Sequence, residues 1–414
     1  MRAHASFRVL LLWLYAIGAS TAPAAAQVRP GIEVLLADSS ALVAGKRIGL
    51  LTNQTGVDRA GRRDVDLLLA APAGRLTLLF SPEHGFAGTA DRLGIPNAVD
   101  SASGLPIYSL YGRTPTSGFT EWDSIDVVVV DLQDVGARYY TYVSTAVILM
   151  EQAARHGKRV LVLDRPDPVG GDAVQGNVRA VAAPEATFVG FLPVPMRPGM
   201  TLGELMLLAN DVLGVHASLT VIPAAGWRRD MYFDATGLPW VKPSPAMPGL
   251  ESALHYSGTC LFEGTNLSVG RGTPFPFAVV GAPWVHTTAL LRRLREAGGG
   301  MREAFAGAEL TPDTITPHAP SDGKYDGVRL NVIRLRVTDR RRYDPTHAAV
   351  ALLAALRAVH RDSLAIVPER FDRLAAGAAL RRDLVRGVAP AAIWRSWEPG
   401  LARFRRARLK YLLY

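Results

Sequence analysis

Cysteine is almost absent from the sequence: Cys260 is the only one in 414 residues, so no disulfide can form within the chain. Beyond the first residues, no apolar run approaches the roughly 20 residues that a membrane-spanning helix needs. The zinc motif H-E-x-x-H and the phosphate-loop pattern G-x-x-x-x-G-K-S/T are missing, as is the G-x-S-x-G elbow of α/β-hydrolases. These absences disfavour an integral membrane protein, a zinc enzyme, a P-loop nucleotide-binding protein and a serine hydrolase of that type.

The segment 1–26 has the features of a cleavable secretory signal. Arg2 and Arg8 precede a short apolar run at residues 9–17, and small residues follow up to Ala24-Ala25-Ala26. A basic start, a short apolar segment and an A-x-A site are typical of such signals. We therefore expect cleavage near Gln27 and an exported, soluble protein that is periplasmic or extracellular. The signal contains no cysteine for a lipid anchor, so we expect no stable membrane anchor.

The remaining chain is long enough for two domains, because domains commonly span about 100–200 residues. Hydrophobic residues make up 49% of the sequence and charged residues 20%, which is sufficient for packed cores. The formal net charge of +9 suits an acidic partner such as an anionic cell-wall polymer. Because the basic residues are scattered apart from a cluster at 403–410, we expect no nucleic-acid partner. The sequence leaves the oligomeric state open.

Strand-like and helix-like patterns alternate between residues 31 and 223. Apolar runs predict strands at 47–51, 76–80, 125–131, 159–164 and 219–222. Helical patterns lie at 65–70, 141–155 and 201–213, and the last begins with a capping box formed by Thr201 and Glu204. The strands are apolar at consecutive positions, which is typical of strands buried on both faces. We therefore predict an α/β domain over residues 27–252 with a mostly parallel, doubly wound sheet.

The C-terminal part, residues 253–414, is predicted to be a smaller unit. Its pattern indicates helices at 287–297, 345–359 and 390–413 and an alternating strand at 328–337. The proline-rich segment 227–258 should be an irregular connection that also carries site residues.

Polar side chains gather after four successive predicted strands. In an open parallel sheet, ligands bind beyond the carboxyl ends of the strands, where loops and helix N-termini converge. The segments that follow the strands are Thr52-Asn53-Gln54-Thr55-Gly56, Ser81-Pro82-Glu83-His84-Gly85, Asp131-Leu132-Gln133-Asp134-Val135-Gly136-Ala137-Arg138 and Asp164-Arg165-Pro166-Asp167-Pro168. Acids, amides and arginines concentrated in this way predict a functional site at this edge of the sheet.

Glu83 is the first candidate for acid–base chemistry. It lies between a proline and a histidine in a tight loop, where a carboxyl group can be held rigidly and partly desolvated. Such burial would raise its pKa and allow it to act as a general acid at neutral pH. A structural role is equally consistent with the sequence, namely that Glu83 caps the following turn or pairs with Arg92.

Asp131 and Asp134 bracket a loop that also contains Gln133 and Arg138. An acid beside an arginine usually forms an ion pair that shapes the loop, and we expect this for at least one of the two. The alternative is that these side chains bind sugar hydroxyls or orient the catalytic acid.

Asp164 and Arg165 allow the same two interpretations. The tyrosines at 139, 140 and 142 could form a flat stacking surface for a sugar ring. Because they stand at the start of a predicted helix, one or two of them should instead belong to the core.

A second polar stretch, residues 259–273, contains three glycines, which imply unusual backbone angles or close approach to a ligand. Glu263, Asn266 and Arg271 supply a carboxylate, an amide and a cation there. A carboxylate from this stretch facing Glu83 across a domain cleft would give the paired acids of glycoside hydrolysis. The separation of such a pair determines whether the anomeric configuration is retained or inverted.

Cys260 stands close to His255, which invites a thiol-nucleophile interpretation. A lone cysteine entering an apolar strand is more often simply buried, and we favour burial. The nine histidines show no ligand spacing, so we expect neither a metal nor a cofactor.

Several ordered motifs together resemble the bacterial exo-β-N-acetylmuramidases, glycoside hydrolases of peptidoglycan that were long catalogued as a domain of unknown function. The likeness covers essentially the whole chain after the predicted signal. The motifs are Leu51-Thr52-Asn53-Gln54-Thr55-Gly56, Ser81-Pro82-Glu83-His84-Gly85, Asp131-Leu132-Gln133-Asp134-Val135-Gly136, Leu163-Asp164-Arg165-Pro166, Phe262-Glu263-Gly264-Thr265-Asn266, Trp394-Arg395-Ser396-Trp397-Glu398-Pro399 and Tyr411-Leu412-Leu413-Tyr414.

The resemblance implies a Rossmann-like N-terminal domain, a smaller C-terminal domain and an active-site cleft between them. It also implies release of terminal N-acetylmuramic acid from peptidoglycan fragments during wall turnover or recycling. Glu83 is then the leading catalytic acid and Glu263 its partner. The residues expected to position the sugar are Asn53, Thr55, His84, Asp131, Gln133, Asp134, Arg138, Tyr142, Asp164, Arg165, Asn266 and Arg271.

Two positions depart from the family pattern. Gln175 precedes Gly176 where many relatives carry glutamate, and Val269 stands where some relatives do. If the glutamate replaced by Gln175 were catalytic, this protein would be impaired or would cleave another substrate. Two alternatives therefore remain: a peptidoglycan-binding protein that has lost turnover, and a glycosidase or esterase acting on another cell-wall sugar.

Overall fold

The computed structural model describes residues 27–91, 94–111, 119–180, 188–296, 298 and 301–414, so the predicted signal at 1–26 lies outside the described residues. The N-terminal domain is built on a seven-stranded sheet in the order β3-β4-β2-β1-β5-β6-β9, parallel except between β3 and β4. Its strands are β1 (Arg47–Thr52), β2 (Arg75–Ser81), β3 (Ala98–Val99), β4 (Pro106–Ser109), β5 (Val127–Asp131), β6 (Arg159–Leu163) and β9 (Leu219–Ile222). The predicted fold class, a mostly parallel α/β sheet, is confirmed.

Helices cover both faces of this sheet. They are α1 (Gly31–Asp38), α2 (Asp64–Ala70), α3 (Tyr142–Arg155) and α4 (Leu202–Val212). Successive side chains of a strand point to opposite faces, so Leu50 packs into the core under α1 and α2 while Leu51 packs into the core under α3 and α4. The predicted capping box begins α4: the Thr201 hydroxyl accepts from the Glu204 backbone, and the Glu204 carboxylate accepts from the Thr201 backbone.

The order of the strands reverses direction between β1 and β5. The chain builds outward from β1 through β2 to β4 and then returns to add β5, β6 and β9 on the other side. At such a switch point the loops beyond the strand ends diverge and leave a crevice for a ligand. A short hairpin, β7 (Gln175–Val178) with β8 (Pro195–Arg197), follows β6.

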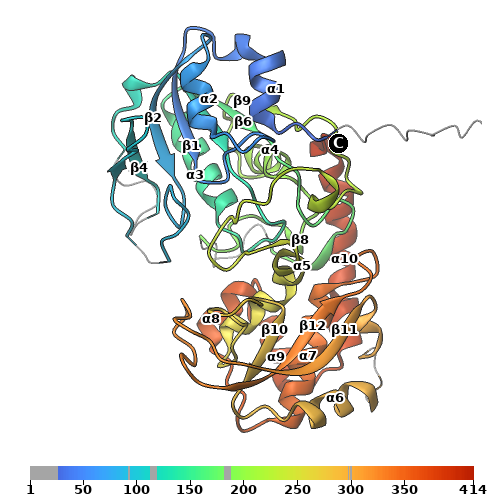
Figure 1. The fold of residues 1–414 in the computed structure, drawn as a ribbon. Helices are drawn as coiled ribbons and strands as arrows, with labels where there is room; N and C mark the ends of the chain where they lie inside the picture. Colours follow the sequence, from blue (N-terminus) through green and yellow to red (C-terminus); the bar gives the residue numbers. More distant parts are fainter. Residues whose placement is uncertain (1–26, 92–93, 112–118, 181–187, 297, 299–300) are drawn as a thin grey trace, which may run out of the picture.

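The C-terminal domain contains a three-stranded antiparallel sheet in the order β10-β12-β11, with helices packed beside it (Figure 1). Its strands are β10 (Val279–Ala282), β11 (Ala308–Ile315) and β12 (Leu330–Val337). Its helices are α5 (Leu250–Thr259), α6 (Thr287–Glu296), α7 (Pro345–Val359), α8 (Pro368–Leu374), α9 (Ala379–Arg386) and α10 (Pro390–Arg408). Within the described ranges, no helix combines the length and the apolar character needed to cross a bilayer.

Helix α10 runs from the C-terminal domain up along the N-terminal domain (Figure 1). Near its end the buried Arg408 donates from Nη1 to three carbonyl oxygens of the N-terminal domain, those of Gly171, Pro198 and Gly199, at 2.6–3.0 Å. The hydroxyl of Tyr414 donates to Asp164 Oδ2 at 2.8 Å. The end of the chain thus fastens the two domains together.

The predicted strands and helices of the N-terminal domain agree with the structure to within two residues at each end. Two predictions were wrong. Residues 250–259 form α5 rather than irregular chain, and Cys260 enters the 3₁₀ turn Cys260–Gly264 rather than a strand. The small hairpin β7–β8, the strands β3, β4, β10 and β11, and the helices α1, α8 and α9 were not predicted, because each is short or mixed in pattern.

Helix α5 packs against the start of α7 through Gly258, where an added Cβ would lie 1.9 Å from the carbonyl oxygen of Pro345. We predict that Gly258→Ala lowers the free energy of unfolding by about 1–3 kcal/mol, because backbone atoms cannot rotate away as a side chain can. The matched control is Gly249→Ala at the cap of the same helix, where a Cβ would meet nothing within 4 Å. Denaturant titration of both variants tests this, and equal midpoints would contradict it.

Candidate active site

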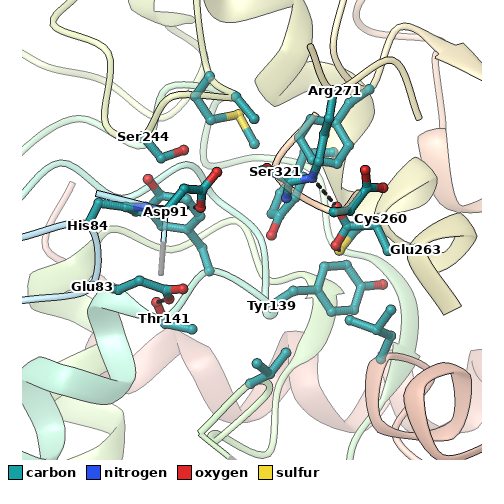
Figure 2. Close-up of a pocket in the computed structure, with 18 of the residues that line it drawn as sticks. Glu83, His84, Asp91, Tyr139, Thr141, Ser244, Cys260, Glu263, Arg271 and Ser321 are labelled. Atoms are coloured by element: carbon teal, nitrogen blue, oxygen red, sulfur yellow. Dashed lines mark hydrogen bonds and ion pairs between the residues drawn. The ribbon is translucent and has the colours of Figure 1, made fainter. Parts of the chain in front are cut away.

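A cavity of about 420 Å³ lies between the two domains, a size typical of small-molecule sites. Loops that follow β2 and β5 form one wall, and α8 with the segment after α5 forms another. Figure 2 shows Glu83, His84 and Thr141 on one side and Cys260, Glu263 and Arg271 on the other. The remaining lining residues are Asp91, Tyr139, Tyr140, Val189, Ser244, Ala246, Met247, Tyr256, Phe277, Ser321, Asp322, Arg370, Arg373 and Leu374.

Glu83 reaches the cavity because β2 ends two residues earlier, at Ser81. The hydroxyl of Thr141, just before α3, donates a hydrogen bond to Glu83 Oε2. Burial raises the pKa of the Tyr111 hydroxyl, and the neighbouring Glu83 carboxylate raises it further. Among the described residues, Glu83 is therefore held by hydroxyl groups, and its proposed structural partner Arg92 lies outside them.

His84 adopts a left-handed backbone conformation with φ of 69°, which is uncommon for a residue with a side chain. Its Nδ1 lies 2.8 Å from the carbonyl oxygen of Ala90 and 3.5 Å from Asp91 Oδ1. Because a carbonyl oxygen can only accept, Nδ1 carries the proton in this arrangement and Nε2 is left as the acceptor of the neutral ring.

Glu263 is the second acidic residue expected to act in catalysis, and it forms an ion pair with Arg271. Arg271 Nε lies 2.6 Å from Glu263 Oε1, and the two side chains are only 19% and 21% exposed. The guanidinium also lies over the ring of Phe277, 5.2 Å from its centroid. This pairing stabilises the charged carboxylate, in contrast to the hydroxyl environment of Glu83.

Two of the glycines after α5 have the unusual backbone that the sequence predicts: Gly270 and Gly272 have φ of 80° and 75°. Gly264 acts differently. A Cβ added at this position would lie 2.6 Å from the Cα of Phe371, so only glycine allows α8 to approach the turn that carries Glu263.

Several residues expected to position the sugar instead form a buried network below the cavity, outside its lining. Asn53 Oδ1 accepts from the backbone N–H of Thr55 at 2.9 Å, and Asn53 Nδ2 donates to the hydroxyl of Tyr142 at 2.8 Å. The backbone N–H of Gln133 donates to Thr55 Oγ1 at 3.1 Å. Because all four side chains are buried, they support the loops that carry Glu83 and Thr141.

Asp131 and Arg165 also lie outside the cavity lining, paired in the interior. Arg165 donates to both carboxylate oxygens of Asp131 and to the carbonyl of Val57. This is the loop-shaping ion pair that the sequence suggested, although its cation is Arg165 rather than Arg138. Asp164 is buried too: it accepts from Thr201, Gly203 and Tyr414, and burial raises its pKa to about 6.

Arg138 and Asn266 have structural contacts rather than positions in the cavity wall. Arg138 is buried and donates from Nη2 to the carbonyl of Leu374, at the end of α8, at 2.9 Å. Asn266 binds the backbone of Ser363 and Ala365, just before α8, at 2.8 and 2.9 Å. Both residues thus hold the helix that forms one wall of the site.

The two positions that depart from the family pattern lie away from the cavity wall. Gln175 stands on β7, where its Oε1 accepts from Arg197 at 3.0 Å and its Nε2 donates to the carbonyl of Tyr343 at 3.3 Å. Val269 is fully buried in the apolar core. Neither is among the residues that line the cavity.

Cys260 lines the cavity but is only 1% exposed, as the sequence suggested. Burial raises the pKa of its thiol, and burial lowers the pKa of His255 to about 3. The His255 ring bonds to Tyr343 at 2.7 Å, so no thiolate–imidazolium pair forms. In the part of the chain that the structure describes, no group of three or more His, Cys, Asp or Glu side chains is placed to hold a metal ion.

Several polar or charged residues of the wall were not predicted from the sequence: Asp91, Thr141, Ser244, Ser321, Asp322, Arg370 and Arg373. The sequence contains a local signal for two of them, Arg370 and Arg373. Two arginines three residues apart share a helix face, and a helix over 368–374 could have been inferred from Pro368 at its first turn.

Two adjoining carboxylates, Asp134 and Asp167, are buried beneath the loop after β5. Each accepts a backbone hydrogen bond on Oδ1, and each has an Oδ2 atom without a hydrogen-bond partner among the described residues. Burial raises the pKa of both carboxyl groups to about 7. They therefore hold protons in the folded protein at pH values where they would ionise in the unfolded chain.

Known proteins are similar to this chain over both of its domains. The families described as "Exo-beta-N-acetylmuramidase NamZ, N-terminal" and "Exo-beta-N-acetylmuramidase NamZ, C-terminal" match residues 48–251 and 254–414. The chain is 38% identical over 393 residues to the peptidoglycan beta-N-acetylmuramidase NamZ of Bacillus subtilis (strain 168), covering 94% of this chain and 92% of that protein. Two solved DUF1343 family proteins of Bacteroides fragilis NCTC 9343 are also similar, with TM-scores of 0.83 and 0.73 at 32% and 29% identity, each match covering 94% of this chain and 99% of the other.

We predict that Asp134→Asn changes how stability depends on pH. In the wild type this group stabilises the fold fully below its unfolded pKa, near 4, and that contribution is lost as pH rises through about 7. Asparagine does not titrate, so the variant should gain stability relative to the wild type over this window, by up to about 1.4 kcal/mol per pKa unit. Denaturant unfolding of both proteins at several pH values measures the difference, and parallel pH curves would contradict the prediction.

Proposed function

The chain belongs to the exo-β-N-acetylmuramidase NamZ family and is a glycoside hydrolase, and we propose that Glu83 and Glu263 are the two carboxyl groups with which it removes terminal β-linked N-acetylmuramic acid from peptidoglycan fragments. The observation that carries this assignment is their placement on facing walls of one cavity between the domains (Figure 2). Paired carboxyl groups of this kind are what glycoside hydrolysis requires.

The surroundings of the two carboxyl groups suit different roles. The partners of Glu83 among the described residues are hydroxyl groups, and we assign it the role of proton donor to the glycosidic oxygen as the bond from C1 breaks. Glu263 is paired with Arg271, and its carboxylate can activate water or take the sugar at C1. In either route water supplies the hydroxyl that ends on C1, and the proton from Glu83 leaves with the departing sugar.

The groups around Glu83 would position the sugar ring. His84 Nε2 and the hydroxyl of Ser244 offer hydrogen bonds, while Tyr139 and Tyr140 line the cavity as largely buried rings. The non-catalytic alternative depended on Gln175, which contacts Arg197 and Tyr343 outside the cavity wall. A catalytic function is therefore favoured over sugar binding alone.

We propose that the protein acts outside the cytoplasm during cell-wall turnover or recycling. The basic and apolar pattern of residues 1–26 supports export, and the fully buried Val28 belongs to the folded domain directly after the expected cleavage site. The formal net charge of +9 suits a site of action among anionic wall polymers.

We predict that Glu83→Gln lowers kcat on a natural muramyl disaccharide by about 100- to 10,000-fold, the range expected for loss of a general acid. The loss should be smaller on p-nitrophenyl β-N-acetylmuramide, because p-nitrophenolate departs with little protonation. Glu263→Gln should slow both substrates severely, because its role does not depend on the leaving group. Steady-state rates of both variants on both substrates measure this pattern.

The matched control is Glu369→Gln, which removes an exposed carboxylate of α8 that does not line the cavity and should retain wild-type rates. Wild-type-like kcat in the Glu83 and Glu263 variants would refute the assignment of the two groups. Absence of muramide hydrolysis by the folded wild type would refute the proposed substrate.

For export, we predict that the full-length chain produced in a bacterial host is recovered outside the cytoplasm with an N-terminus near Gln27. Replacing Leu11 with arginine interrupts the apolar run and should leave an uncleaved, cytoplasmic protein. N-terminal sequencing of fractionated cells tests both outcomes, and an uncleaved wild type retained inside the cell would contradict the proposal.

A further inference from the structure

Two arginines of the cavity wall, Arg370 and Arg373, have no acidic partner among the residues that the structure describes. They lie three residues apart on α8 and therefore project from one face of the helix, while Phe371 and Leu374 of the other face are buried. Both arginine side chains are exposed and both line the cavity. Among the described residues, neither forms an ion pair or a hydrogen bond, in contrast to Arg271 on the same wall.

Three acids of the cavity wall are in contact with other residues. Glu263 pairs with Arg271 (2.6 Å), Asp322 with Lys324 (3.9 Å), and Asp91 lies 3.5 Å from the ring of His84. On α8 itself, Asp372 pairs with Arg381 of α9 at 2.7 Å. Within the part of the chain that the structure describes, the two guanidinium groups therefore have no paired acid.

The helix that carries these arginines is held at both ends. At its start, the backbone N–H of Val367 donates to the carbonyl of Gly264 at 2.8 Å. Past its end, Asn177 Nδ2 donates to the carbonyl of Ala375 at 2.6 Å, in addition to the bond from Arg138 to Leu374. These contacts from both domains fix the backbone of α8. The two guanidinium groups therefore lose less conformational entropy when a ligand binds.

We infer that Arg370 and Arg373 form a carboxylate-binding subsite that recognises the lactyl carboxylate of the muramyl residue. The inference rests on the proposed function. Guanidinium groups bind carboxylates through paired, charge-assisted hydrogen bonds. N-acetylglucosamine has the same ring and acetamido group but no lactyl ether, so this subsite is where the C-terminal domain distinguishes the two sugars.

The test is calorimetric binding of N-acetylmuramic acid and N-acetylglucosamine to the wild type and to the double variant Arg370→Gln/Arg373→Gln. The wild type should bind N-acetylmuramic acid at least about 10-fold more tightly, and the double variant should lose most of this preference. Binding of N-acetylglucosamine should change less than about threefold. In the same way, KM for a muramide substrate should rise in the double variant.

The matched control is Arg382→Gln/Arg386→Gln, which removes two exposed arginines of α9 that do not line this cavity and lowers the net charge equally. If the control weakens N-acetylmuramic acid binding as much as the cavity variant does, general attraction and not a subsite is responsible, and the inference is overturned. An unchanged preference in the cavity variant, with its thermal midpoint preserved, overturns it as well.

A carboxylate could also come from a peptide attached to the lactyl group. The lactyl methyl ester and muramyl dipeptide separate the two sources. We expect both to bind the wild type about as weakly as N-acetylglucosamine. If the dipeptide binds tightly and this binding needs the two arginines, the subsite reads a peptide carboxylate and the lactyl assignment fails. Because these readouts are binding constants, loss of the proposed catalytic activity would not be mistaken for failure of the subsite.

Discussion

The attachment of the chain's C-terminal end to the N-terminal domain is the constraint on which the cavity depends. Neither domain alone supplies both carboxyl groups, because Glu83 follows a strand of the parallel sheet and Glu263 follows α5. Arg408 and Tyr414, at and beyond the end of α10, bind carbonyl and carboxylate groups of the N-terminal domain and limit how far the walls can separate. A single apolar core that continues through both domains adds to this restraint.

The buried charges of the N-terminal domain serve the same purpose at shorter range. Asp131 with Arg165, and Asp164 with Thr201 and Tyr414, occupy the strand ends at which a sheet of this kind exposes its functional loops. The raised pKa of Asp164 indicates the cost of its burial. These buried groups hold the loops in place, while the residues that line the cavity form a separate layer.

This arrangement explains which parts of the site could be predicted from the sequence. The runs of valine and leucine predicted the sheet, and the rule for parallel strands predicted the edge at which Glu83 lies. Residue type could not distinguish Asn53, which faces inward, from His84, which faces the cavity, because both follow strands in polar loops. Arg370 and Arg373 could not be placed at all, because their helix reaches the cavity only through a tertiary contact between Gly264 and Phe371.

Val28 and Trp227 are buried in one small apolar cluster, and Tyr414 packs against them. The ring of Tyr414 meets that of Trp227 edge to face at 4.8 Å. The folded part of the chain that begins at residue 28 should therefore tolerate circular permutation, in which a short linker joins residues 28 and 414 and new ends open in an exposed loop. The architecture that the two domains form together therefore does not depend on which of them is synthesised first.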